Sequence, residues 1–395
     1  MSLGITKLAV KNYRSLAQLE LNLGPINVFF GPNGSGKTTI LDTIWFFRDC
    51  AIRGVGLATS ERDHGIGILW DQADEREQIE LCLTISELSY ELKFGLSAGR
   101  IEPFAAELLK TVNGDRVLIQ RRLGTCKAQH FHANINQTVE ANLREPDKLS
   151  LGLYLDFNQQ MDSAAASLDR LLHSVRFFHS RSFYLHKLKT QGSEGGPEIR
   201  LRDRVENAWS VLRNLHDRKS VDTRYDTIMD YMTQAFPSFD GLLLEQTGLN
   251  SVYASFRERM RRKEIRASGV SDGHLQLLLL LTALFSEGPG REAVILFDEP
   301  EISLHPWALT IFAKAVQDAA ENWRKQVLIA THSPVLLSQF EIGDVLASQV
   351  VDGRTQVTRL SEMEEVRDLL EQYAAGSLYM SEAIAAQSGS MGGEQ

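Results

Sequence analysis

The sequence predicts an α/β protein: a mixed sheet around a phosphate-binding loop, an early antiparallel β-lobe and a helical lobe. A glycine-rich loop near residue 31 lies between a strand pattern and a helix pattern. Two apolar segments late in the chain end in polar residues, which is typical of strands whose ends form a site. Residues 77–137 alternate between apolar and polar, which is typical of antiparallel strands exposed on one face.

The early strands follow from this alternation. Residues 3–10 and 17–23 have period two and are joined by a polar connection with one aromatic residue, Tyr13. Further strands are predicted over 79–85 and 89–96. Another strand follows the turn signal Asn113-Gly114. An antiparallel sheet is therefore expected early in the chain.

The glycine-rich loop fits the phosphate-binding pattern G-x-x-x-x-G-K-[ST]. The segment reads Gly31-Pro32-Asn33-Gly34-Ser35-Gly36-Lys37-Thr38, and Thr39 opens the following helix pattern. An apolar strand over 26–30 precedes it. Glycines let the backbone approach phosphate oxygens, and the helix N-terminus favours the anion. We expect Lys37 to reach the β- and γ-phosphates of ATP and the Thr38 hydroxyl to bind Mg²⁺.

Two later strands supply the other half of the predicted site. The segment 293–297 is followed by Asp298 and Glu299. Asp298 is predicted to hold Mg²⁺, and Glu299 to act as a general base on the attacking water. The segment 326–331 is followed by His332, which we expect near the γ-phosphate. Acidic pairs also end strands at ordinary loops, and a lone histidine is more often structural.

A third segment contains small residues before a long apolar helix. Ser271, Asp272 and Gly273 precede the apolar run 275–285, which is far shorter than a bilayer span. A helix that begins here offers its N-terminus to an anion. The plain alternative is a helix N-cap, which Ser271 or Asp272 would provide.

These segments, in this order, resemble the ABC-type ATPase heads of the RecF/SMC-like and OLD-like families. The segment 11–16 resembles the opening N-F-[RK]-S of those families, 31–38 their Walker A, and 296–300 their Walker B. Residues 270–274 resemble a degenerate ABC signature, 301–306 the segment E-x-x-L-H-P, and His332 the switch histidine.

The resemblance implies a homodimer or higher oligomer closed by ATP. Ser271 and Gly273 of one subunit would complete the ATP site of another, and Arg14 would contribute to nucleotide binding. Asp272 stands where the signature has glycine, so the pattern of closure departs from the family. Gln159 and Gln160 are the candidates for the Q-loop residue. No long coiled coil is visible, and after residue 376 we expect no room for a nuclease domain.

The motifs divide the chain into four expected parts. They are an N-terminal nucleotide-binding lobe (1–145), a helical insertion (146–265), a C-terminal lobe with signature, Walker B and switch histidine (266–386), and a disordered tail (387–395).

Composition limits the partners. The net charge of −9 argues against a surface that grips nucleic acid everywhere, but a local patch can still do so. Arg257–Arg266 is the densest basic run, and Arg200, Arg202 and Arg204 belong to a second one. Either could contact phosphates, or form a solvated face with interleaved acids. Three separated cysteines and no signal peptide or membrane span favour a cytoplasmic protein.

Three functions remain open from the sequence. The first is an ATPase whose head closure gates a separately encoded effector, in phage defence or DNA repair. The second is a slow nucleotide switch, and the third is a DNA-binding repair factor. The rate of turnover and its stimulation by DNA distinguish them.

Overall fold

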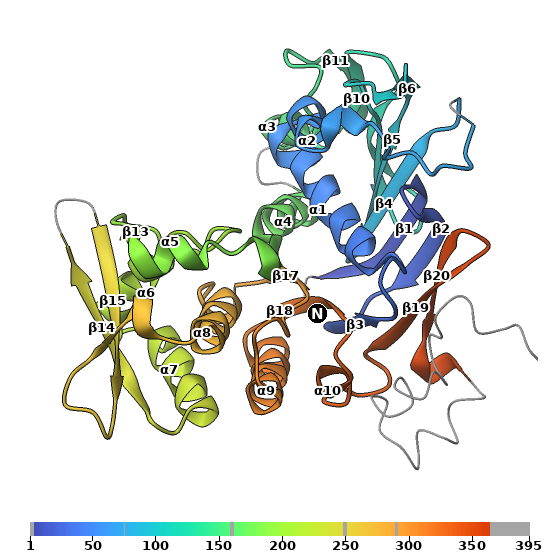
Figure 1. Ribbon diagram of the computed structural model, residues 1–395. Coiled ribbons are helices and arrows are strands. Elements are labelled where there is room, and N and C mark those ends of the chain that lie inside the picture. The colour runs from blue at the N-terminus through green and yellow to red at the C-terminus, as the bar shows by residue number, and fades with distance from the viewer. Residues whose placement is uncertain (1–3, 75, 159–161, 248–250, 289–290, 364–395) are drawn as a thin grey trace, which may run out of the picture.

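The structure is a computed structural model that describes residues 4–74, 76–158, 162–247, 251–288 and 291–363. Figure 1 shows a central sheet with an antiparallel lobe on one side and a third lobe of helices and a small sheet on the other. Gln159, Gln160 and the predicted tail 387–395 lie outside the described residues.

The central sheet has six strands in the order β12-β17-β18-β3-β19-β20. All neighbours are parallel except the last pair, so the predicted mixed sheet is confirmed. The strands are β12 (Arg176–His179), β17 (Ala293–Asp298), β18 (Lys325–Thr331), β3 (Ile26–Phe30), β19 (Val345–Val351) and β20 (Arg354–Arg359). The three adjacent strands β17, β18 and β3 are buried along their whole length, as suits strands covered on both faces.

The central sheet separates two hydrophobic cores. In β3, Val28 and Phe30 face one core, whereas Phe29 faces the other. The same alternation holds in β17, where Phe297 and Leu296 face opposite cores. Successive side chains of a strand point to opposite faces, so each central strand ties the two cores together.

The first core lies between the central sheet and the antiparallel lobe. That lobe is an eight-stranded sheet whose pairings are antiparallel throughout, as the sequence predicts. Its order is β11 (Gln137–Asn142), β10 (Lys127–His132), β9 (Val117–Arg121), β8 (Ala106–Thr111), β5 (Leu88–Phe94), β4 (Ile79–Ile85), β1 (Ile5–Tyr13) and β2 (Leu16–Asn22). Helices α1 (Lys37–Arg53) and α4 (Ser163–Ser174) supply further buried residues of this core.

The second core lies on the opposite face of the central sheet. It packs the apolar side chains of α6 (Ala208–His216), α7 (Arg224–Ala235), α8 (Asp272–Phe285) and α9 (Pro306–Asn322). The helix that the sequence predicts after Gly273 is α8, and all its residues from Leu275 to Phe285 are buried. The other helices are α2 (Val55–Ser60), α3 (Leu151–Asn158), α5 (Leu185–Thr190) and α10 (Pro334–Leu337).

The segment 146–265 contains more strand than the sequence predicts. Strand β12, which joins the central sheet, lies where the sequence allows a strand over 175–178. The addition is a third sheet of β13 (Ser193–Glu194), β14 (Phe239–Gln246) and β15 (Ser251–Glu258). Strand β16 (Ile265–Arg266) also pairs with β15. Residues 200–207, which were expected to be helical, precede α6 as a loop. No helix in the described part of the chain has the length and apolarity to cross a membrane.

Candidate nucleotide site

The predicted phosphate loop is a tight turn between β3 and α1. Gly31, Gly34 and Gly36 have φ of 150°, 79° and 92°, which side chains rarely adopt. A Cβ on Gly31 would lie 2.0 Å from the Ser348 carbonyl oxygen. Helix α1 then begins at Lys37. The loop therefore leaves backbone N–H groups at a helix N-terminus, which is the chemistry that a phosphate requires.

Lys37 is folded against its own loop. Its Nζ donates to the carbonyls of Gly31 at 2.7 Å and Pro32 at 2.8 Å, and it lies 3.5 Å from Ser35 Oγ. The side chain is buried, and burial lowers its pKa although Asp298 and Glu299 oppose this. Asn33 and Gly34 lie exposed at the tip of the loop, and the Thr39 carbonyl accepts from Thr43 within α1.

The two predicted metal ligands are in contact. The hydroxyl of Thr38 donates to both carboxylate oxygens of Asp298, at 3.0 and 3.1 Å, although 260 positions separate them. Strand β18 lies between β17, which ends at Asp298, and β3, which precedes the loop that carries Thr38. The parallel pairing brings the ends of all three strands to one edge of the sheet. A hydroxyl and a carboxylate supply the oxygen ligands that Mg²⁺ prefers, with phosphates and water completing the set.

Glu299 occupies a special backbone conformation next to Asp298. Its φ is 51°, and its N–H donates to the Ala330 carbonyl at 2.9 Å, across to β18. The carboxylate pairs with Arg181, and its other oxygen lies 3.7 Å from Nδ1 of His332. Glu299, the predicted general base, thus lies between Arg181 and His332.

Glu301 positions the predicted switch histidine. One of its oxygens accepts from the His332 N–H at 2.9 Å and from the Thr331 hydroxyl at 2.8 Å. Nδ1 of His332 lies 3.4 Å from that same oxygen. The second oxygen of Glu301 is buried without a partner among the described residues, so it is poised to accept a further donor.

Two residues of this cluster were missed by the sequence reasoning. Nδ1 of His179 lies 2.7 Å from Asp298, and Arg181 pairs with Glu299. The Asp298 carboxylate raises the pKa of His179. His179 ends β12 in register with Asp298. The signal was an apolar strand followed by His-Ser-Arg, which is the same kind of signal that identified His332.

Arg14 lies at the β1–β2 turn and contacts α1. Its guanidinium is 3.3 Å from Asp42, a carboxylate that also accepts from Arg62 and from the Tyr13 hydroxyl. Ser15 lies against the phosphate loop, since a Cβ on Gly36 would meet its Oγ at 3.0 Å. The nucleotide contact of Arg14 stays a prediction.

The signature-like segment lies apart from the phosphate loop. Ser271 caps α8 by accepting from the His274 N–H at 3.3 Å, and Asp272 pairs with Lys189. Gly273 packs so closely that a Cβ would lie 2.7 Å from the Ser303 carbonyl oxygen. Among the described residues, no hydrogen bond or ion pair joins Ser271 or Gly273 to the phosphate loop.

Comparisons with known proteins show which family the chain resembles. A family model described as "AAA domain, putative AbiEii toxin, Type IV TA system" matches residues 26–338. The OLD nuclease of Thermus scotoductus is 23% identical over 360 residues, which cover 85% of this chain and 61% of that protein. The DNA replication and repair protein RecF of Shewanella loihica is 30% identical over 152 residues, 38% of this chain and 34% of RecF. The chain thus spans less than two thirds of these relatives.

A solved structure shares the fold. The crystal structure of an Smc head bound to the C-winged helix domain of ScpA superposes with a TM-score of 0.51 at 14% identity. The match covers 92% of this chain and 99% of that one.

The crowded contact at Gly31 gives a test of the loop geometry. Gly31→Ala places a Cβ against a backbone oxygen at 2.0 Å, so we expect it to destabilise the protein by about 1–3 kcal/mol or more. Gly34→Ala is the matched control, because Gly34 also has positive φ but no atom within 4 Å of a Cβ. Thermal unfolding measures both, and equal shifts in melting temperature would contradict the geometry.

Proposed function

The chain belongs to the AAA-domain family whose model matches it, and from that premise we propose that it binds and hydrolyses ATP with Mg²⁺. The observation that carries this proposal is the contact of Thr38 with Asp298 beside Lys37. A phosphate loop, a metal-binding hydroxyl and a strand-end aspartate are the parts that phosphoryl transfer requires. Bound ATP would supply the phosphoanhydride bond. Mg²⁺ would supply positive charge that withdraws electrons from the phosphate groups.

The residues of the chain have separate tasks in this proposal. Lys37 would bind the β- and γ-phosphates in place of the carbonyls of its own loop, and Thr38 and Asp298 would hold the metal. Glu299 takes a proton from the attacking water. Arg181 occupies one oxygen of Glu299, so this pair has to open before that oxygen can accept a proton. His332, anchored through Glu301, would contact the γ-phosphate.

The proposed cycle includes closure of two copies around ATP. The support is the position of Ser271 and Gly273 at the start of α8, away from the phosphate loop of the same chain. A helix N-terminus favours an anion, so the site is completed when a second copy brings this end to the bound triphosphate. Closure would gate a separately encoded effector, in phage defence or DNA repair.

DNA binding is the second candidate function. It is supported by the similarity to RecF and by the basic turn that follows β15. Arg257 pairs with Asp240, and Arg261 pairs with Glu258. Arg259, Arg262 and Lys263 are exposed and have no ion pair among the described residues, so they could face phosphates.

Two substitutions separate binding from hydrolysis. Lys37→Ala should abolish ATP binding because it removes the charge facing the phosphates. Glu299→Gln should keep ATP binding but slow hydrolysis by about 10²–10⁴-fold, because the amide cannot accept the proton. Labelled-nucleotide binding and phosphate release measure these effects, with the exposed Glu321→Gln on α9 as a control. Hydrolysis at the normal rate in Glu299→Gln would refute its catalytic role.

ATP-dependent closure can be tested by particle size. Light scattering of Glu299→Gln should report a larger particle when ATP and Mg²⁺ are added. Adding Ser271→Arg should prevent this increase through bulk and misplaced charge, whereas Ser220→Arg, at an exposed turn, should not. An assembly that ignores both ATP and Ser271→Arg would contradict the proposed interface.

DNA binding is tested by salt dependence. The triple alanine variant of Arg259, Arg262 and Lys263 should bind duplex DNA more weakly, equally across sequences, and with a flatter salt slope. Alanine at Arg122, Lys127 and Lys148, which are exposed in the antiparallel lobe or close to it, provides a charge-matched control. If the wild type had no affinity for duplex DNA at low salt with ATP present, DNA binding would be excluded as a function.

A further inference from the structure

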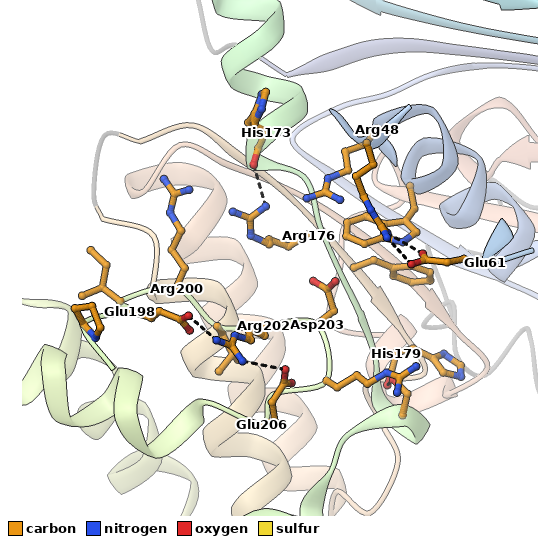
Figure 2. A pocket seen from close by; sticks show the side chains of 18 residues that line it. Arg48, Glu61, His173, Arg176, His179, Glu198, Arg200, Arg202, Asp203 and Glu206 are labelled. Atoms are coloured by element: carbon orange, nitrogen blue, oxygen red, sulfur yellow. Dashed lines mark hydrogen bonds and ion pairs between the residues drawn. The ribbon is translucent and has the colours of Figure 1, made fainter. Parts of the chain in front are cut away.

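A large cavity of about 1210 Å³ lies beside the nucleotide site, at the β12 edge of the central sheet. Figure 2 shows side chains from α1, from the α4–β12 connection and from the loop 197–206 pointing into it. Trp45 and Arg48 on α1 are eight and eleven residues after Lys37. At 1.5 Å per residue they lie about 12–17 Å along the helix from the phosphate loop. The cavity therefore offers space separate from the phosphates of ATP.

Every second residue from 200 to 204 in the loop 197–206 is an arginine that lines this cavity. Arg200, Arg202 and Arg204 are exposed, whereas the intervening Leu201 and Val205 are buried in the second core. Asn207 fixes the loop, because its side chain donates to the Arg200 carbonyl at 2.9 Å and to Glu198 at 2.6 Å.

Val205 holds this loop in an unfavourable backbone conformation. Its φ is 58°, a value that is rare for a β-branched residue. Such strain persists only where the surroundings determine the conformation, and it is concentrated at functional sites. The row of arginines is therefore a preformed feature of the surface.

The arginines of the cavity are not matched one to one by carboxylates. Six arginines and four carboxylates line the cavity, and Arg48 pairs with Asp49 outside it. Arg176 and Arg200 share one carboxylate, Glu287, at 3.4 and 3.1 Å. Arg204 contacts the hydroxyl and the ring of Tyr184 and has no carboxylate partner among the described residues.

One acid, Asp203, lies at the centre of the cavity. Asp203 lies among these arginines in Figure 2. Burial raises the pKa of the Asp203 carboxyl, although Arg48 and Arg176 oppose this shift. Arg176 and Arg200, which share Glu287, suit a phosphate, because a guanidinium group binds phosphate oxygens in a planar, bidentate manner.

Aromatic side chains lie in the same cavity. Trp45 and Phe177 both line it, are half-buried, and meet edge to face with ring centroids 6.1 Å apart. The Arg48 guanidinium lies over the Trp45 ring at 4.5 Å. Aromatic rings beside arginines form the surface on which nucleobases stack, at about 1–3 kcal/mol per base.

We propose that this cavity binds a phosphorylated nucleoside, its phosphate held by Arg176 and Arg200, which meet at Glu287, and its base placed against Trp45 and Phe177. Arg204, which also lines the cavity, adds positive charge. The same chemistry is offered by a free nucleotide and by the phosphorylated end of a nucleic-acid strand. An acidic peptide would satisfy the arginines but would leave the aromatic surface without a planar partner.

The cavity is connected to the proposed ATPase site by one short segment. His179 and Ser182 line the cavity, and His179 contacts Asp298 while Arg181 pairs with Glu299. A ligand that moves this segment changes the two carboxylates on which metal binding and proton transfer depend. This coupling rests on the proposed function, whereas binding in the cavity does not.

Calorimetric titration of Lys37→Ala tests the binding, because this background removes the ATP site as a competitor. The probes are 5′-AMP and an oligothymidylate with and without a 5′-phosphate. We expect the 5′-phosphorylated probes to bind, and Arg200→Ala combined with Arg204→Ala to weaken binding at least tenfold. Both residues are exposed, so the variant retains its core. Arg213→Ala with Arg218→Ala is the control, since neither residue lines the cavity.

The outcomes are distinct. Binding of 5′-AMP identifies a free-nucleotide site, and binding of the phosphorylated oligonucleotide alone identifies a strand-end site. Equal binding of the unphosphorylated oligonucleotide, loss in the control variant, or no binding of any probe overturns the proposal. In the wild type, the bound probe should also shift ATP affinity, and an unchanged affinity would refute the coupling alone. If the wild type did not bind ATP, the proposed function would be refuted. The titration of Lys37→Ala would still decide whether the cavity binds a phosphorylated nucleoside.

Discussion

The parallel pairing of β17, β18 and β3 is the constraint on which the site depends. It brings three strand ends to one edge of the sheet, where Asp298 meets Thr38 across the end of β18. The pairing is held by apolar side chains on both faces, since each of these strands contributes to both hydrophobic cores. A register shift of one residue would exchange those faces, so the cores fix the register and the register fixes the site.

The polar groups of this edge already neutralise one another. Asp298 faces His179 and Thr38, and Glu299 faces Arg181 and His332. Buried or half-buried carboxylates need such partners, because an unpaired charge away from water is costly. The arrangement is therefore a compact network in which any incoming metal ion or phosphate must exchange with existing contacts. The short segment 179–182 is the member of this network that also faces the arginine-lined cavity.

The signature-like helix is organised around packing and is separate from that network. Gly273 is backed by the Ser303 carbonyl, and Lys189 holds Asp272 from α5. These contacts fix the start of α8 on a surface whose own phosphate loop lies elsewhere. The departure from the usual signature, Asp272 for glycine, is thus accommodated by a lysine within the same chain.

The sequence by itself determined the phosphate loop, the strand-end positions of Asp298, Glu299 and His332, and the antiparallel lobe. These features are local: glycine spacing, apolar runs and period-two alternation record backbone conformation within a few residues. Only the tertiary structure decided that His179 lies beside Asp298, because their strands come from segments more than a hundred positions apart and pair through shared burial. It also decided that the segment 146–265 contains a third sheet and a cavity lined by the loop 197–206. For Arg200 and Arg204 the sequence left open whether they contact phosphates or form a solvated face. The packing of Leu201, Val205 and Asn207 is what places both arginines along one cavity.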